Sequence, residues 1–177
     1  MNKDELRARI AEILKENSEP LMPAVLAERL DSSEREILQA LPDEMRAFAP
    51  ASSFDEIWTE LTSWASATLI VQHMGGVFEI KGQLNPGRHG HGYFNLSGSA
   101  PLGGHLKADE VDGICFLSLP FMGRESHSVQ FIHNSGRVMF SVYVGRENHR
   151  LIPAARESFL TLKQRFSTQG QDSLPTS

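Results

Sequence analysis

The hydrophobic pattern of the chain changes its period at about Thr68, and this change limits the folds open to it. Before this point, apolar residues recur at helical spacing, as at Leu6, Ile10 and Ile13. After it, apolar and polar residues alternate, which is typical of half-buried strands. The sequence therefore predicts an α+β fold, in which N-terminal helices precede a mostly antiparallel sheet and a C-terminal helix closes the chain.

The length of 177 residues indicates a single domain. We expect this domain to cover residues 1–166. Within it, residues 1–50 form a helical part, residues 68–145 form the core of the sheet, and residues 153–166 form the closing helix. The remaining residues, 167–177, are mostly polar and are predicted to be disordered.

Local signals place several boundaries inside the domain. Ser33 and Ser53 each stand where they can cap a following helix. The pair at 75–76 is Gly-Gly, which predicts a two-residue hairpin turn between two strands. The glycine- and histidine-rich segment 85–92 is expected to be a loop, and the apolar segment 113–121 to be a buried central strand.

The cysteine content favours a reducing compartment, and the sequence predicts neither a secretory signal nor a membrane span. Cys115 is the only cysteine, so no intrachain disulfide can form and a reducing compartment is the simpler location. The first fifteen residues are charged throughout, unlike a secretory signal. The uncharged stretch 61–78 is 18 residues long but contains polar residues and a glycine pair, so we reject a membrane span.

The charge distribution also argues against a nucleic-acid partner. Residues 21–41 have the spacing of a helix-turn-helix, but the segment 18–46 carries three arginines against seven acidic residues. A DNA-binding surface must neutralise phosphates with cations. We therefore expect this segment to be a packing or dimer element and expect no nucleic acid to bind it.

Nucleophilic catalysis finds little support in the sequence. Cys115 lies in the middle of an apolar strand, where cysteines are normally inert. There is no Gly-x-Ser-x-Gly elbow, and the segment 85–92 lacks the lysine of a phosphate-binding loop. The acidic group Asp109, Glu110 and Asp112 is best explained as a solvated turn. We therefore expect no catalytic residue.

Histidines carry the strongest chemical signal. All seven lie between His73 and His149. His89 and His91 form a His-x-His pair that could hold a transition metal, but two ligands are few for a zinc site. His73 shares strand parity with Leu69, so it is either a core histidine or an axial ligand that reaches an apolar cavity.

Further residues extend this polar set. His105 follows a Gly-Gly pair and precedes Lys107, a context that suits an anionic ligand or an exposed turn. Tyr93 faces away from the apolar residues of its strand. Arg146 and Arg150 close a basic segment after the last strand. Apolar surface, imidazoles and arginines together are what haem requires, because its iron takes His or Tyr and its propionates take cations.

Five short motifs then occur in one order along the chain. They are FDEIW at 54–58, HGHGYFNL at 89–96, GHLK at 104–107, FMG at 121–123 and VGRENHR at 144–150, and VQH at 71–73 fits the same series. Together they make the chain resemble the ChuX/HutX family of intracellular haem-utilisation proteins, over roughly residues 22–165.

This resemblance implies a cytoplasmic, bacterial haem-binding protein with a split-barrel-like fold. It also implies a homodimer that resembles the two halves of the longer ChuS/HemS proteins. Such a protein carries haem from an inner-membrane importer toward a haem-degrading partner. The recurrent histidines of the family would fall on His73 and His105, and the tyrosine of its His-Gly-Tyr-Phe-Asn-Leu motif, a further ligand candidate, would fall on Tyr93.

Around these candidate iron ligands we expect further haem contacts. They are His91 and Lys107, with Arg146 and Arg150 inferred from charge to bind the propionates. The first hypothesis is a carrier that is not an enzyme. The alternatives are an enzyme that degrades haem at the same site, a structural or regulatory dimer without haem, and the disfavoured DNA-binding regulator.

Overall fold

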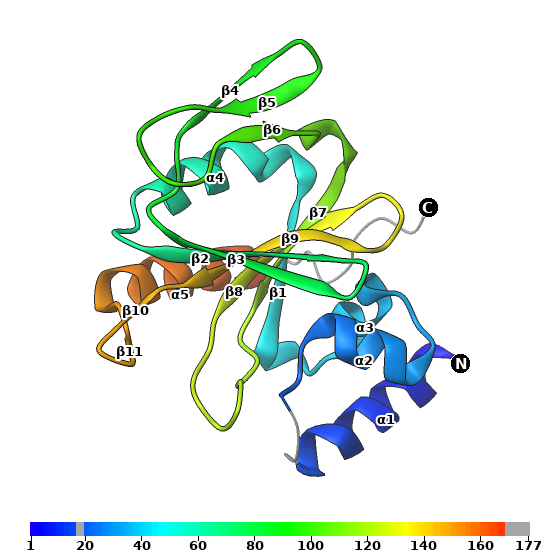
Figure 1. The fold of residues 1–177 in the computed structure, drawn as a ribbon. Helices are drawn as coiled ribbons and strands as arrows, with labels where there is room; N and C mark the ends of the chain where they lie inside the picture. Colours follow the sequence, from blue (N-terminus) through cyan, green and yellow to red (C-terminus); the bar gives the residue numbers. More distant parts are fainter. Residues whose placement is uncertain (17–19, 169–177) are drawn as a thin grey trace.

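The computed structural model describes residues 1–16 and 20–168, and a six-stranded antiparallel sheet forms its centre (Figure 1). The strand order is β1-β7-β8-β9-β2-β3. In that order the strands are Arg46–Pro50, Val111–Leu117, Ser128–His133, Val138–Val144, Ala67–His73 and Gly76–Gly82. The interior strand β7 is buried along almost its whole length, as the apolar run predicts, but it spans residues 111–117 instead of 113–121 and lies second in the sheet, beside the edge strand β1.

Three N-terminal helices pack on one face of this sheet (Figure 1). They are α1 (Lys3–Glu16), α2 (Pro23–Leu30) and α3 (Glu34–Ala40). Ser33 caps α3 in a capping box, in which its side chain accepts from the Glu36 N–H and Glu36 bonds back to the Ser33 N–H. The helices bury an apolar cluster against the sheet that includes Ile37, Phe48 and Ile132. The helix pair that resembles a helix-turn-helix is therefore a packing element.

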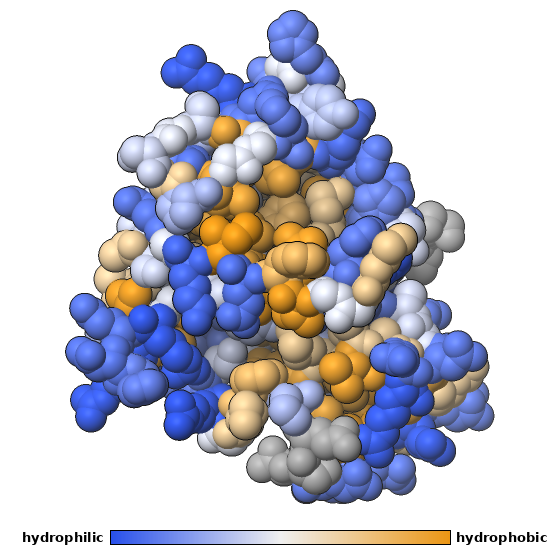
Figure 2. Space-filling model, in the orientation of Figure 1, coloured by the Kyte–Doolittle hydropathy of each residue, from blue (hydrophilic) through white to orange (hydrophobic). Residues whose placement is uncertain are grey.

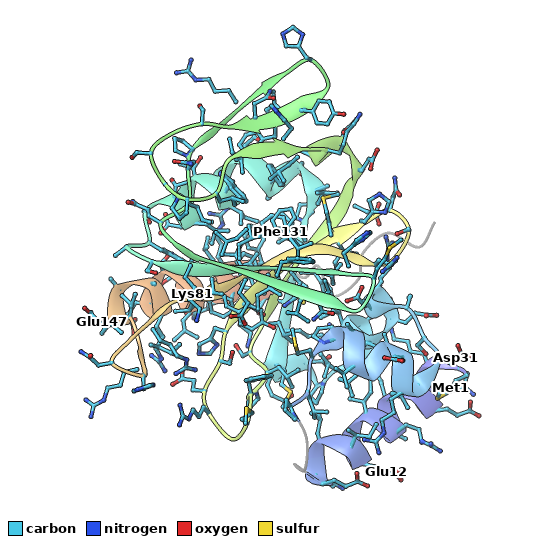
Figure 3. The ribbon with its side chains drawn as sticks, viewed as in Figure 1. Met1, Glu12, Asp31, Lys81, Phe131 and Glu147 are labelled. Atoms are coloured by element: carbon cyan, nitrogen blue, oxygen red, sulfur yellow. The ribbon has the colours of Figure 1, made fainter. Side chains whose placement is uncertain are left out.

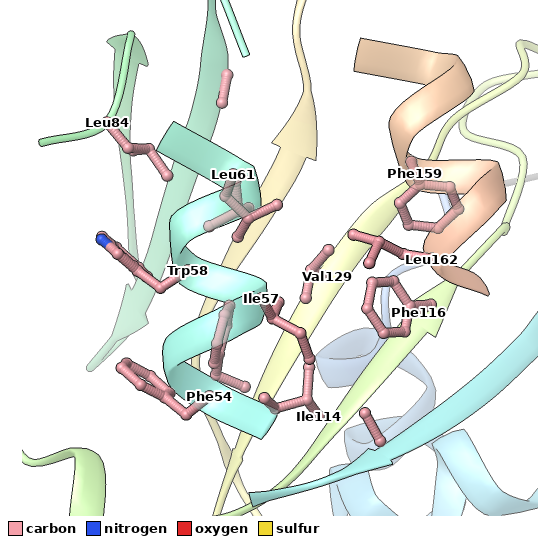
Figure 4. Packing of buried hydrophobic residues seen from close by; sticks show 14 of the residues in the cluster. Phe54, Ile57, Trp58, Leu61, Leu84, Ile114, Phe116, Val129, Phe159 and Leu162 are labelled. Atoms are coloured by element: carbon pink, nitrogen blue, oxygen red, sulfur yellow. The ribbon is translucent and has the colours of Figure 1, made fainter. Parts of the chain in front are cut away.

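Two further helices, α4 (Phe54–Thr62) and α5 (Pro153–Thr168), cover the opposite face of the sheet (Figure 4). Trp58 on α4 and Phe159 on α5 are almost completely buried. Burial of such aromatic side chains supplies much of the apolar area that stabilises a core. This larger cluster therefore fixes the position of both helices on the sheet.

A small three-stranded sheet lies on the far side of α4 from the main sheet (Figure 1). Its strands are β4 (Gly87–Gly90), β5 (Tyr93–Leu96) and β6 (Gly104–Leu106). The Trp58 indole N–H donates to the Asn85 carbonyl at 3.0 Å, just before β4. The Phe54 ring meets Phe94 of β5 edge to face, with the ring centroids 5.1 Å apart. Helix α4 therefore anchors the small sheet.

The remaining elements are short. They are the 3₁₀ turns η1 (Asp43–Met45), η2 (Ala51–Ser53) and η3 (Ala108–Glu110), and the hairpin of β10 (Arg146–Glu147) and β11 (Arg150–Leu151). In the part of the chain that the structure describes, no helix is both long and apolar enough to cross a bilayer.

The observed elements confirm the α+β prediction and correct several details. Residues 46–50 were expected to be helical but form the edge strand β1, because they pair with the buried strand β7. The segment expected to be a loop, 85–92, contains β4, and β6 forms at Gly104–Leu106, where no strand was expected. These short strands contain glycine and few β-branched residues, so their propensity does not reveal them.

Turns and helix ends differ in smaller ways. The first hairpin turns at Met74 and Gly75, both at positive φ, so Gly76 already pairs with His73 in β3. Ser53 makes no side-chain capping bond to α4. Helix α5 continues through residues 167–168, which were expected to be disordered, and residues 169–177 lie outside the described part.

Candidate functional site

The outer face of the small sheet carries the first group of predicted residues. Antiparallel pairing places Asn95 of β5 directly opposite His105 of β6, so the two side chains share one face. Tyr93 and Lys107 follow the same parity. Phe94 lies on the opposite face and is buried against α4. The sheet therefore presents its polar residues to solvent and uses its apolar ones as the anchor.

Asn95 fixes the protonation pattern of His105. The Asn95 amide nitrogen donates to three backbone carbonyls, those of Arg88, Gly90 and Tyr93, at 3.0–3.2 Å. Its Oδ1 must therefore be the acceptor toward His105 Nδ1, 2.6 Å away. Neutral His105 then carries its proton on Nδ1, which leaves the lone pair of Nε2 for a ligand.

Tyr93 and Lys107 complete this group. The Tyr93 and His105 rings lie edge to face, with centroids 5.9 Å apart. Lys107 Nζ stands 4.7 Å from the centre of the Tyr93 ring. One exposed surface thus offers an imidazole nitrogen, a phenol oxygen and an ammonium group. These are the donors that a haem iron and a propionate accept.

The two histidines of the His-x-His pair have different surroundings. His91 is exposed in the β4–β5 turn, at positive φ beside Gly92. His89 Nε2 lies 2.7 Å from the Asp55 carboxylate of α4, and its ring stacks at a tilt against Phe94. His89 thus ties the small sheet to α4. Among residues 1–16 and 20–168, no group of three or more metal-binding side chains occurs.

His73 lies on the main sheet, at the end of β2. It shares a sheet face with Leu69 and Val71, as its parity predicts. However, His73 is exposed, because the apolar cluster ends before the tip of the hairpin. Of the two alternatives for His73, the core histidine is therefore wrong, and the axial ligand stays a prediction. Phe78 of β3 lies on the same face as His73, because it pairs with Val71. The Phe78 side chain is 59% exposed.

The two predicted arginines lie at the β10–β11 hairpin. Arg150 is exposed there. Arg146 donates to the Glu125 and His149 carbonyls. Within the described residues, no hydrogen bond or ring contact joins His73, Arg146 or Arg150 to Tyr93 or His105. The structure thus brings Tyr93, His105 and Lys107 together, with His91 in the adjacent β4–β5 turn, and leaves His73, Arg146 and Arg150 on other parts of the surface.

Sequence reasoning missed a groove of about 650 Å³ on the main sheet, on the face opposite that of His73. It lies over β2, β3 and β9 beside the N-terminal helices, and the connection between β7 and β8 closes one end. Arg146 is the one predicted residue in it. The groove residues are Met22, Ser66, Thr68, Ile70, Val77, Glu79, Lys81, Phe121, Met122, Arg124, Ser126, Tyr143, Val144 and Arg146. The alternation of apolar and polar residues along β2 and β3 could have indicated that the sheet face opposite His73 is also exposed.

The single thiol is unsuited to catalysis, as the sequence predicts. Cys115 is completely buried in β7. This burial raises the pKa of the thiol to about 12, so the thiolate is scarce at neutral pH. We therefore exclude Cys115 from the candidate site.

The arrangement of a helix-flanked antiparallel sheet with a small second sheet defines a known class of fold. It is the fold of the haem-degrading enzyme ChuS of Escherichia coli O157:H7, with a TM-score of 0.66. That match covers 77% of this chain and 41% of ChuS, at 14% sequence identity. The expected likeness to one half of a longer haem protein is thus confirmed for the fold.

The chain belongs to the haem-utilisation ChuX/HutX family, whose model matches residues 47–162. It is 37% identical over 163 residues to the intracellular heme transport protein HutX of Vibrio cholerae. This alignment covers 91% of this chain and 84% of HutX. A crystal structure of ChuX superposes with a TM-score of 0.81 at 30% identity, covering 92% of this chain and 98% of that one. The family predicted from the short motifs is confirmed.

Proposed function

We propose that this protein is a cytoplasmic haem carrier that binds imported haem and passes it to a haem-degrading partner. The observation that carries the proposal is the arrangement of His105, Tyr93 and Lys107 on one exposed surface. Asn95 holds His105 in the tautomer whose Nε2 can bind iron. Membership of a haem-utilisation family supports haem as the ligand.

Exposure of the candidate ligands suits transfer better than storage. Tyr93 and His105 lie on the surface, so an acceptor protein can approach a haem that is bound there. Iron in haem accepts imidazole or phenolate. The primary ligand we propose is His105 or Tyr93, and Lys107 and His91 contact the rest of the haem. If the iron can exchange between His105 and Tyr93, the carrier has a route by which to release the haem.

His73 is the second ligand that we propose. It stands at the exposed tip of the β2–β3 hairpin, next to an apolar side chain that could cover a porphyrin face. In the homodimer that we also propose, this hairpin could meet the small sheet of the second copy. The site would then draw ligands from both copies, with Arg150 as a further propionate contact.

Hemin titrations of single variants test this assignment. We expect His105→Ala and Tyr93→Phe each to shift the Soret band and to weaken binding by about tenfold, because each removes a candidate iron ligand. His73→Ala should shift the band to a smaller extent. His149→Ala, which removes an exposed histidine from the β10–β11 turn, is the matched control and should leave the spectrum unchanged.

A triple variant decides whether these residues hold haem at all. If replacement of His73, Tyr93 and His105 together leaves both the affinity and the spectrum as in the wild type, the proposed ligands are wrong. Circular dichroism of each variant distinguishes loss of a ligand from loss of the fold.

A further inference from the structure

Residues 118–127 connect β7 to β8 and close one end of the groove on the main sheet. Figure 2 shows the molecule hollowed below the β2–β3 hairpin, with apolar side chains around the hollow. At the tip of the connection, Phe121 and Arg124 exchange both of their backbone hydrogen bonds, at 2.9 and 3.0 Å. Met122 and Gly123 between them have positive φ, so the tip is a tight turn. Its position is therefore determined at the base of the connection.

One buried histidine joins the two ends of this base. Ser118 follows the last residue of β7, and His127 precedes the first residue of β8. His127 Nδ1 lies 2.9 Å from Ser118 Oγ, and its Nε2 lies 2.7 Å from the Glu125 carboxylate. His127 is 6% exposed, and its ring lies against Phe159 of α5, with the centroids 4.9 Å apart. The imidazole thus holds both ends of the connection against the core.

The donors and acceptors of this cluster fit a neutral imidazole. The Lys163 ammonium of α5 can only donate, so Ser118 Oγ accepts its bond at 3.0 Å. The Ser118 hydroxyl hydrogen is then free to point at His127 Nδ1. The ionised carboxylate of Glu125 can only accept, so His127 Nε2 carries the ring proton. Every bond in this chain therefore has one donor and one acceptor while Nδ1 is unprotonated.

Protonation of His127 would disturb this arrangement. Nδ1 would become a donor, so the hydroxyl hydrogen of Ser118 would have to turn away. The imidazolium would share the Ser118 oxygen with the Lys163 ammonium. It would share Glu125 Oε1 with the Arg156 guanidinium, which lies 2.7 Å from that oxygen. Burial lowers the pKa of His127, Glu125 opposes this shift, and Arg156 and Lys163 add to it.

The other charged groups around the cluster supply no second carboxylate. In the part of the chain that the structure describes, the carboxylate bonded to His127 is that of Glu125 alone. Arg146 of β10 donates to the Glu125 carbonyl and so adds a further cation. Glu147, the next residue of β10, is exposed at the edge of the molecule (Figure 3). Glu44 meets Lys163 through its backbone carbonyl, at 2.6 Å.

We propose that His127 is a pH-sensitive switch for the β7–β8 connection. Neutral His127 holds the connection at the end of the groove, and protonated His127 releases it. The released segment carries Phe121 and Met122, so its movement opens that end of the groove. The switch does not depend on the haem site proposed above, because His105 and Tyr93 lie on the small sheet.

A spin label on Met122→Cys measures this movement. Cys115 is completely buried, so the label attaches to the new thiol. We expect an immobile label at about pH 7.5 that becomes mobile as the pH falls below 6.5. Because one proton is involved, the ratio of mobile to immobile label should rise by at most about tenfold per pH unit.

Two histidine variants of the labelled protein assign the response. His127→Gln should keep the label immobile over the whole pH range. Its amide can accept from Ser118 and donate to Glu125, but it takes up no proton. His133→Gln replaces the histidine at the other end of β8 and is the matched control, so it should respond to pH as the parent does.

Two further measurements separate release from unfolding. Ser118→Ala removes the bond to Nδ1 and should make the label mobile already at about pH 7.5. A label on Arg9→Cys, which is exposed on α1, should not change over the same pH range.

Four results would overturn the proposal. They are a pH-independent label at residue 122 in the parent, the same pH response in His127→Gln, an immobile label in Ser118→Ala, and a simultaneous change of the label at residue 9. The last result would mean that the whole chain unfolds.

Discussion

Asn95 shows how one uncharged residue orients a neighbouring candidate ligand, His105. Its amide donates to three carbonyls of the β4–β5 hairpin and accepts from His105. The histidine, the tyrosine and the lysine of this surface could be predicted from the sequence because their residue types carry the chemistry. Asn95 could not, because its role depends on the pairing of β5 with β6 and on the path of β4.

Replacement of this residue should therefore weaken haem binding through His105. We expect Asn95→Ala to lower hemin affinity several-fold and to broaden the Soret band, because His105 loses the bond that selects its tautomer. The measurement is a hemin titration of this variant, of His105→Ala and of the double variant. If Asn95→Ala weakens binding as much in the His105→Ala background as in the wild type, Asn95 does not act through His105.

Among the elements, α4 links the two sheets. Trp58 contacts Phe94 of the small sheet and both Phe131 and Phe140 of the main sheet, with centroid distances of 5.9–6.2 Å. The helical pattern of residues 54–61 predicts α4. The apolar run that begins at residue 113 predicts β7. The strands β1 and β6 could not be predicted. Strand β1 is stabilised by its pairing with β7, which is distant in the sequence, and β6 by a very short pairing with β5.

Loss of the Trp58 ring should destabilise the whole fold. We expect Trp58→Ala to lower the free energy of unfolding by about 3–5 kcal/mol, the usual cost of removing a large buried aromatic side chain. Trp58→Phe keeps most of the packing but leaves the Asn85 carbonyl without its donor, at a cost of about 1–3 kcal/mol. Urea unfolding followed by circular dichroism measures both. Equal stability of all three proteins would contradict this role of α4.

The base of the β7–β8 connection contains a buried histidine that should make stability depend on pH. Burial lowers the pKa of His127, although Glu125 at 2.7 Å opposes the shift. Arg156 and Lys163 of α5 add positive charge around it, and Ser118 bonds to its Nδ1 at 2.9 Å. The unfolded chain, with a His127 pKa near 6.5, therefore binds a proton more readily than the folded one.

This contribution to stability is complete above about pH 6.5 and falls as the pH drops toward the lower pKa of folded His127. We expect the urea midpoint to decrease between pH 7 and pH 5, and to decrease less in His127→Gln. The comparison of the two proteins at each pH removes the effect of the other titrating groups. If both proteins show the same pH dependence of the urea midpoint, residues other than His127 cause it.

At the scale of the whole molecule, the main sheet has an apolar cluster on each face. The family model begins at residue 47, so the N-terminal helices lie outside it. They nevertheless cover Phe48, Cys115 and Ile132. Sequence patterns predict these helices but cannot show which face they cover, because that depends on the strand order.

Removal of the helices should therefore expose one face of the sheet. We expect a chain of residues 44–177 to aggregate, or to bind a hydrophobic dye strongly, because its apolar cluster would meet water. Size-exclusion chromatography and dye fluorescence check this. A monodisperse truncated protein with the wild-type urea midpoint would show that the helices are not needed for the fold.

A hemin titration of the purified protein, followed by addition of ascorbate, shows whether the protein carries haem. We expect a saturable Soret band at one strongly coordinated haem per chain. That band should persist under ascorbate, since a carrier keeps its ligand intact. Decay of the band to a bile-pigment spectrum would instead indicate a haem-degrading enzyme. Absence of any saturable band would contradict haem binding altogether.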